Sequence, residues 1–106
     1  MSTIIESQPE KPANPYELYT EHTGGAFIVF ETTERTALPL FSLKKATLRS
    51  AGNNETLTCD FGDIQVFVEG SGMADVFEQM LNGRVKMIRR GVLKQCHVQK
   101  IQIIGA

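Results

Sequence analysis

The sequence predicts an α+β domain, with a mainly antiparallel sheet or partly open barrel of about five to seven strands and one amphipathic helix packed on it. Several short segments alternate between apolar and polar side chains, or are rich in β-branched and aromatic residues, which is typical of strands. Glycine, asparagine and proline separate these segments, as turns require. Only the stretch at about 72–82 repeats its apolar residues at helical spacing.

The chain has 106 residues, which is enough for one modest core, and its 42% of apolar and 22% of charged residues are ordinary for a globular domain. Residues 1–14 contain two prolines and few apolar groups, so we expect a disordered tail there and a single domain over 15–106. Asn14 can cap a helix and Pro15 suits the first helical position, so a short helix is expected to begin here.

The first strand is expected over 26–32, a segment rich in aromatic and β-branched residues. Phe27 and Val29 share the face that we assign to the core, and Ile28 and Phe30 share the opposite face. Because both faces carry large apolar groups, this strand should be covered on both sides.

Three further strands are expected before the helix, over 45–50, 55–61 and 63–69. Pro39 marks the preceding segment as an edge strand or a turn, because proline cannot donate to a sheet ladder. The Ala-Gly-Asn-Asn run at 51–54 fits a hairpin connection. The inward phase slips by one residue at Gly62, which indicates a turn there.

The helix at about 72–82 has an apolar face, formed by Met73, Val76, Phe77, Met80 and Leu81. Gly83 is well placed to end it, and strands are expected afterwards over 84–90 and 96–104. Antiparallel strands followed by one amphipathic helix resemble a pleckstrin-homology-like barrel, an analogy of fold that implies no function. The two strands after the helix depart from that pattern.

Two patterns around glycine have simpler explanations than catalysis. Gly70-Ser71-Gly72 precedes a helix, as phosphate-binding loops do, but no P-loop lysine follows and Asp75 would repel an anion. The pattern therefore favours a corner between strand and helix. Asp60 and Asp63 flank a glycine, where carboxylates usually bond to the backbone of a turn.

Cys96-His97 is the only adjacent pair of a thiol and an imidazole. Neighbours on a strand point to opposite faces, so these two side chains should not meet. Cys59 and His22 lie far away in sequence and complete no metal-ligand spacing. The sequence therefore predicts two free thiols, no catalytic residue, no metal site and no cofactor, which makes an enzyme the least favoured class.

The charge distribution is the least ordinary feature of the chain. The first 78 residues hold twelve acidic and five basic groups, a net charge of −7, whereas the last 28 hold six basic groups and no acid, a net charge of +6. A surface that binds nucleic acid or anionic lipid would use the basic residues Arg84, Lys86, Arg89, Arg90 and Lys100. The isoelectric point near 6.1 and the lack of aromatic residues in this segment argue against nucleic acid. The basic groups would otherwise protect an edge strand, or face the acidic half within the monomer or across subunits.

The leading hypothesis is a non-catalytic interaction module that self-associates as a homo-oligomer. Large apolar residues lie opposite the predicted core faces of their strands and need a cover: Ile28, Phe30, Phe67, Ile88 and Ile104. An anion-binding module is the alternative, and an unrecognised enzyme comes third. No apolar run approaches the ~20 residues of a membrane-spanning helix, and the start of the chain lacks the pattern of a secretory signal, so we expect a cytoplasmic location.

Overall fold

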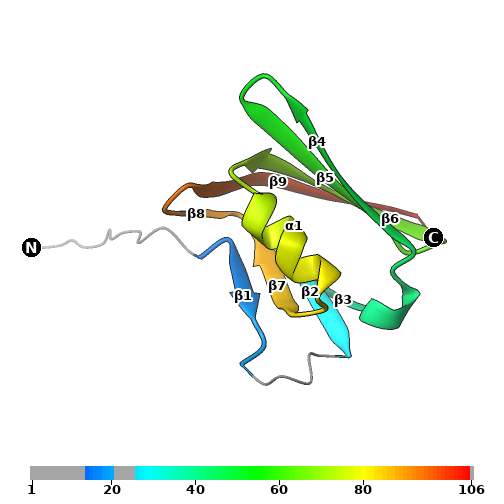
Figure 1. Ribbon diagram of the computed structural model, residues 1–106. Helices are drawn as coiled ribbons and strands as arrows, with labels where there is room; N and C mark the ends of the chain where they lie inside the picture. The colour runs from blue at the N-terminus through cyan, green and yellow to red at the C-terminus, as the bar shows by residue number, and fades with distance from the viewer. Residues whose placement is uncertain (1–13, 21–25, 106) are drawn as a thin grey trace, which may run out of the picture.

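The computed structural model describes residues 14–20 and 26–105, which form two β-sheets and one α-helix (Figure 1). The four-stranded sheet consists, in spatial order, of β1 (Tyr16–Leu18), β7 (Val85–Arg89), β2 (Phe27–Glu31) and β3 (Arg35–Pro39). The five-stranded sheet consists of β4 (Lys45–Ala51), β5 (Asn54–Asp60), β6 (Ile64–Ser71), β9 (Cys96–Gly105) and β8 (Gly91–Leu93). The helix is α1 (Ala74–Leu81), and a 3₁₀ turn, η2 (Leu40–Ser42), joins β3 to β4.

This architecture confirms the predicted α+β class, with antiparallel sheets and one amphipathic helix. Every strand pairing among the described residues is antiparallel except that of β2 with β7. The strands divide between two sheets, and no barrel closes within this part of the chain. Three strands follow α1, which departs from the pleckstrin-homology-like pattern as the sequence predicts.

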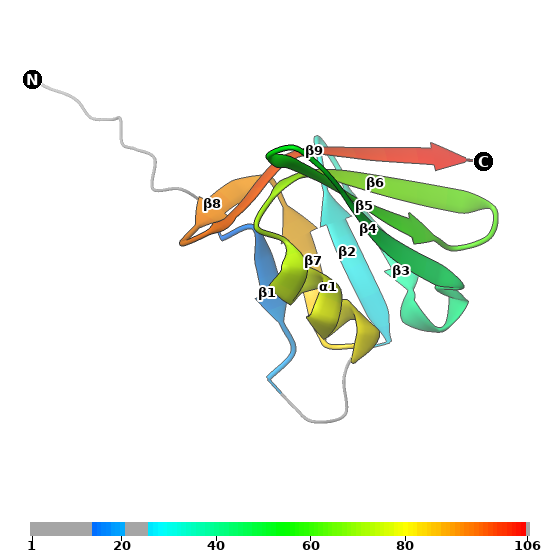
Figure 2. The same cartoon turned by 45° about the horizontal axis from the view of Figure 1, so that its top comes forward.

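The core lies between the two sheets, and α1 lies against β7 of one sheet and β4 of the other (Figure 2). The inner face of the five-stranded sheet follows the predicted alternation, because Leu57, Cys59, Val66 and Val68 are fully buried. Phe30 of β2 meets Phe61, which follows β5, edge to face with ring centroids 6.2 Å apart. This contact joins the two layers.

The predicted orientation of β2 is wrong. Ile28 and Phe30 are fully buried, whereas Phe27 is 46% exposed. Both faces of this strand are apolar, so alternation alone does not say which one faces the core. Glu31 shares the face of Phe27, and its ion pairs with arginines of the neighbouring strands place that face outside.

Two β-bulges, one in β7 and one in β9, change which residues of these strands face the core. Glu17 of β1 pairs with Met87 and the next residue pairs with Val85, which leaves Lys86 as the extra residue of β7. Val85 and Ile88 are consequently both fully buried. A second bulge occurs where β6 pairs with β9, and there the extra residue is Gln99.

The helix expected to begin at Asn14 is replaced by β1, and that prediction is wrong. Tyr16–Leu18 pairs antiparallel with β7, and the Arg89 N–H donates to the Pro15 carbonyl at 2.8 Å. A strand partner far along the chain therefore overrides the local capping signal. Residues 1–13 of the predicted tail lie outside the described residues.

Candidate functional site

The two cysteines are free and buried in positions that suppress their reactivity. Burial raises the pKa of the Cys59 thiol to about 12. The pKa of Cys96 is also raised, first by burial and then by the negative charges of Glu55 and Asp75. Both thiols are therefore protonated near neutral pH, whereas nucleophilic cysteines need a lowered pKa.

The glycines before α1 are explained by packing between strands. A Cβ atom added at Gly70 would lie 1.8 Å from the His97 carbonyl oxygen, so β6 can approach β9 this closely only with glycine there. The beginning of α1 already has an anionic partner, because the Met73 N–H donates to the Glu55 carboxylate at 2.8 Å. No phosphate cradle remains at this corner.

Asp60 bonds to the backbone of its own turn. The Gly62 N–H donates to the Asp60 carboxylate at 2.8 Å, which supports the turn interpretation. Within the described ranges, no three His, Cys, Asp or Glu side chains gather so that they could hold a metal ion.

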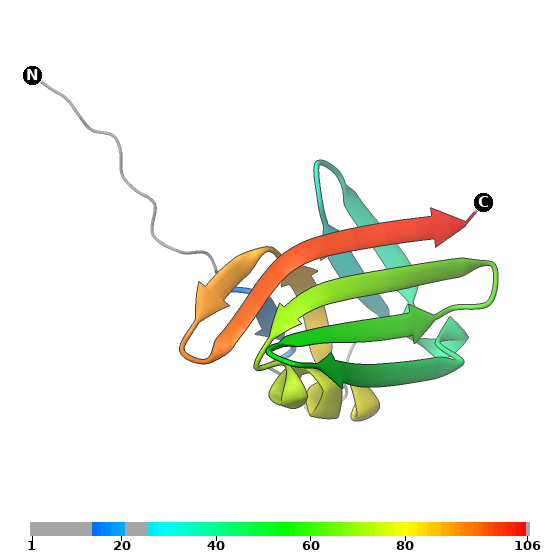
Figure 3. The same cartoon turned by 90° about the horizontal axis from the view of Figure 1, so that it is seen from above.

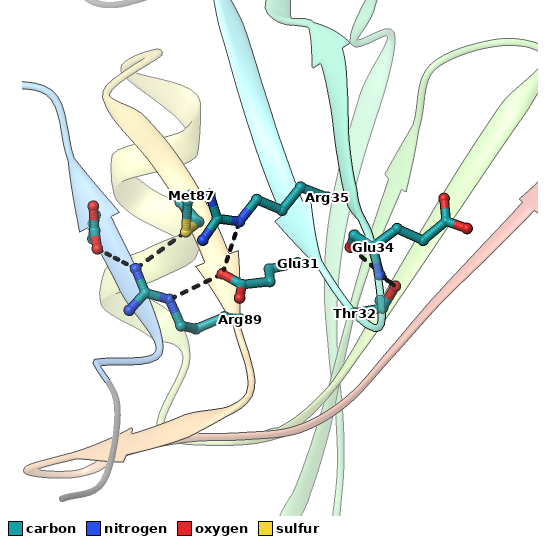
Figure 4. A network of polar contacts seen from close by, with 7 residues as sticks. Glu31, Thr32, Glu34, Arg35, Met87 and Arg89 are labelled. Atoms are coloured by element: carbon teal, nitrogen blue, oxygen red, sulfur yellow. Dashed lines mark hydrogen bonds and ion pairs between the residues drawn. The ribbon is translucent and has the colours of Figure 1, made fainter.

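Arg89, one of the five basic candidates, belongs to a charge network on the outer face of the four-stranded sheet (Figure 4). Its guanidinium contacts Glu17 of β1 and, at 3.6 Å, Glu31 of β2. Glu31 also lies 3.9 Å from Arg35 of β3. This network joins all four strands, and it leaves Arg89 neutralised.

The structure does not bring the other basic candidates onto one face. Arg84 precedes β7, and its guanidinium donates to the Tyr19 carbonyl at 3.4 Å. Lys86 is exposed at the bulge. Arg90 and Lys100 line one hollow of about 240 Å³. Periodicity predicts a common strand face for Arg84, Lys86 and Arg90, and the bulge breaks that periodicity.

The apolar candidates for self-association divide into two groups. Phe30 and Ile88 are fully buried by this chain's own residues, as is Ile28, so their assignment to the surface is wrong. Phe67 is half-buried on the outer face of the five-stranded sheet, and Ile104 of β9 is 49% exposed. The remaining surface candidates thus lie on adjacent strands, β6 and β9.

One edge of β9 is open over most of its length (Figure 3). β9 pairs with β6 along its whole length, but only Cys96–Val98 pairs with β8 on the other side. From residue 99 to 105, no described strand occupies that side. An open edge presents unpaired backbone N–H and C=O groups that bind another strand. Only the pairing pattern reveals this feature, and no sequence motif marks it.

A groove separates this open edge from the β2–β3 hairpin. One hollow of about 240 Å³ lies beside Gln99, Lys100 and Ile101. A second of about 410 Å³ continues beside residues 101–103, and the turn at 32–34 forms its other wall. The groove gives an incoming extended segment access to the edge.

No family model, curated protein or solved structure matches this chain. In the part of the chain that the structure describes, no helix has the length and apolar content needed to cross a membrane.

Proposed function

We propose that this chain is a small, non-catalytic interaction module that self-associates by pairing the open edge of β9 with the same edge of a second copy. The observation that carries the proposal is the unpaired backbone from residue 99 to 105, next to the 49% exposed Ile104. Antiparallel pairing about a two-fold axis would join two five-stranded sheets into one continuous sheet.

The side chains of β9 allow a favourable register for this pairing. Residues opposite each other in an antiparallel pair lie on the same face, so inward residues must meet inward residues. A pairing centred on Gln102 places Ile101 opposite Ile103 and Lys100 opposite Ile104. It buries apolar groups against each other and keeps the two Lys100 ammonium groups from facing one another directly.

Two observations make this proposal preferable to the alternatives. Anion binding is disfavoured because Arg89 is already paired with two carboxylates. The hollow that Arg90 and Lys100 line is also lined by Glu31, which would repel an anion. The enzyme alternative has two protonated, buried thiols and no metal-ligating cluster among the described residues.

The test is the solution mass, measured by sedimentation over a range of concentrations at low and high salt. We expect a dimer in the wild type and, in Gln102→Lys, association weakened by about tenfold, because two added ammonium groups would face each other and approach both Lys100 side chains. Gln65→Lys is the matched control: it adds the same charge to the same face of the sheet, but on β6, away from the edge. A wild type that stays monomeric at tens of micromolar, or a dimer that Gln102→Lys leaves intact, would overturn the proposal.

A further inference from the structure

A second groove lies at the opposite edge of the five-stranded sheet, where α1 ends. It has a volume of about 330 Å³ and separates the last turn of α1 from η2 and the start of β4. Its walls include Leu40, Leu43, Lys44, Lys45, Met80 and Leu81. None of these residues belongs to β9 or to the groove beside it.

The two most exposed large apolar side chains among the described residues lie on the two elements that flank this groove, η2 and α1. Leu81 is 63% exposed and forms part of the wall, and Phe41 is 86% exposed in the middle of η2, directly after Leu40. A single exposed apolar side chain is ordinary, but two of them on the elements that flank a groove are typical of a binding surface. Because Phe41 contributes so little to the core, the fold itself does not explain it.

The charged residues that line this groove are all positive. Lys44 and Lys45 are the charged residues that line it, and no carboxylate of the described chain does. The stem of Lys44 lies over Gly62, with its Cε 3.1 Å from the position of an added Cβ atom, which limits where the ammonium group can go. An incoming segment with acidic residues would therefore meet two lysines and no acid at this groove.

We propose that this groove binds an extended apolar segment with acidic flanking residues, supplied by another protein. The apolar walls would contact the apolar centre of the segment, and the two lysines would pair with its acidic flanking residues. A second copy of this chain fits less well, because a symmetric contact would bring Lys44 and Lys45 of both copies together. This inference is independent of the pairing at β9, since the two sites lie at opposite edges of the sheet.

The test begins with a library of random short peptides selected on the immobilised wild-type protein. We expect the enriched peptides to carry an apolar centre flanked by Asp or Glu. The affinity of one enriched peptide, measured by fluorescence anisotropy, should fall at least about tenfold in Phe41→Ala and Leu81→Ala. Neutralising the lysines in Lys44→Gln/Lys45→Gln should remove most of the salt dependence of binding.

Matched controls distinguish this groove from other exposed groups. Leu93→Ala removes an apolar side chain of β8 that is 41% exposed and lies outside both proposed sites, and Lys86→Glu reverses an exposed charge on the other sheet, so both should bind the peptide like the wild type. Thermal unfolding checks that every variant is folded.

Three results would overturn the inference: no enrichment, enrichment of peptides with basic flanks, or binding that survives Phe41→Ala and Leu81→Ala. Groove signals in an NMR spectrum that shift with protein concentration alone would instead identify a second copy as the occupant.

Discussion

The outer faces of the two sheets differ far more than their inner faces. On the five-stranded sheet the outer face is polar, with Thr47, Thr58 and Gln65 around the half-buried Phe67. On the four-stranded sheet the register places Phe27, Val29 and Ala37 together on the outer face, and a charge network closes one end. Polar residues thus mark most of the outer face of one sheet, whereas on the other they are gathered in the charge network of Glu17, Glu31, Arg35 and Arg89.

The largest expected effect tests which face of β2 is inside. Phe30→Ala should lower the free energy of unfolding by about 3–5 kcal/mol, because it removes a fully buried ring and its contact with Phe61. Phe27→Ala, at a site 46% exposed, should cost less than about 1 kcal/mol. Urea denaturation measures both, and Phe30→Leu serves if the alanine variant does not fold. Equal losses at the two positions would contradict the orientation of β2.

The face of a strand that points to the core could be predicted where the other face is polar. Where both faces are apolar, the sequence left that choice ambiguous. Leu57, Cys59, Val66 and Val68 alternate with polar residues, and the structure buries all four. β2 has two apolar faces, so the count of apolar residues was uninformative there. Its acidic residue, Glu31, was the available signal, because a carboxylate is costly to bury without a partner.

The bulges and the open edge depend on how the strands pair, and the alternation of apolar and polar residues gives no information about that pairing. Lys86 and Gln99 each add one residue to a strand, and a constant period of two then assigns the wrong face beyond them. At a constant period of two, Arg84, Lys86 and Arg90 would share one face, and the bulge at Lys86 breaks that period. The edge of β9 is likewise a property of the strand order, and it appears only once β8 is known to end at Leu93.

An intermediate effect is expected from the charge network of the four-stranded sheet. Arg89→Ala should lower the free energy of unfolding by about 2 kcal/mol, because it removes two ion pairs and the packing of a side chain that is only 22% exposed. Arg49→Ala, an exposed arginine on the outer face of the other sheet, should change it by less than about 0.5 kcal/mol. Part of the loss should also appear in wild-type protein at high salt, since the network is partly exposed. An Arg89 variant as stable as the Arg49 variant would mean that the network is incidental.

The smallest expected effect concerns how the five-stranded sheet holds α1. Glu55 of β5 accepts a hydrogen bond from the Met73 N–H at 2.8 Å, where a carboxylate also meets the positive end of the helix dipole. Glu55→Ala should therefore lower the free energy of unfolding by about 1 kcal/mol, and Glu55→Gln by less, since the amide oxygen can still accept the bond. Glu69→Ala is the matched control, because Glu69 is an exposed acid of β6 that directly precedes Gly70, the residue that pairs with Glu55. If both alanine variants unfold at the same urea concentration as the wild type, α1 is held by its apolar face alone, and the polar link between this sheet and the helix has no energetic role.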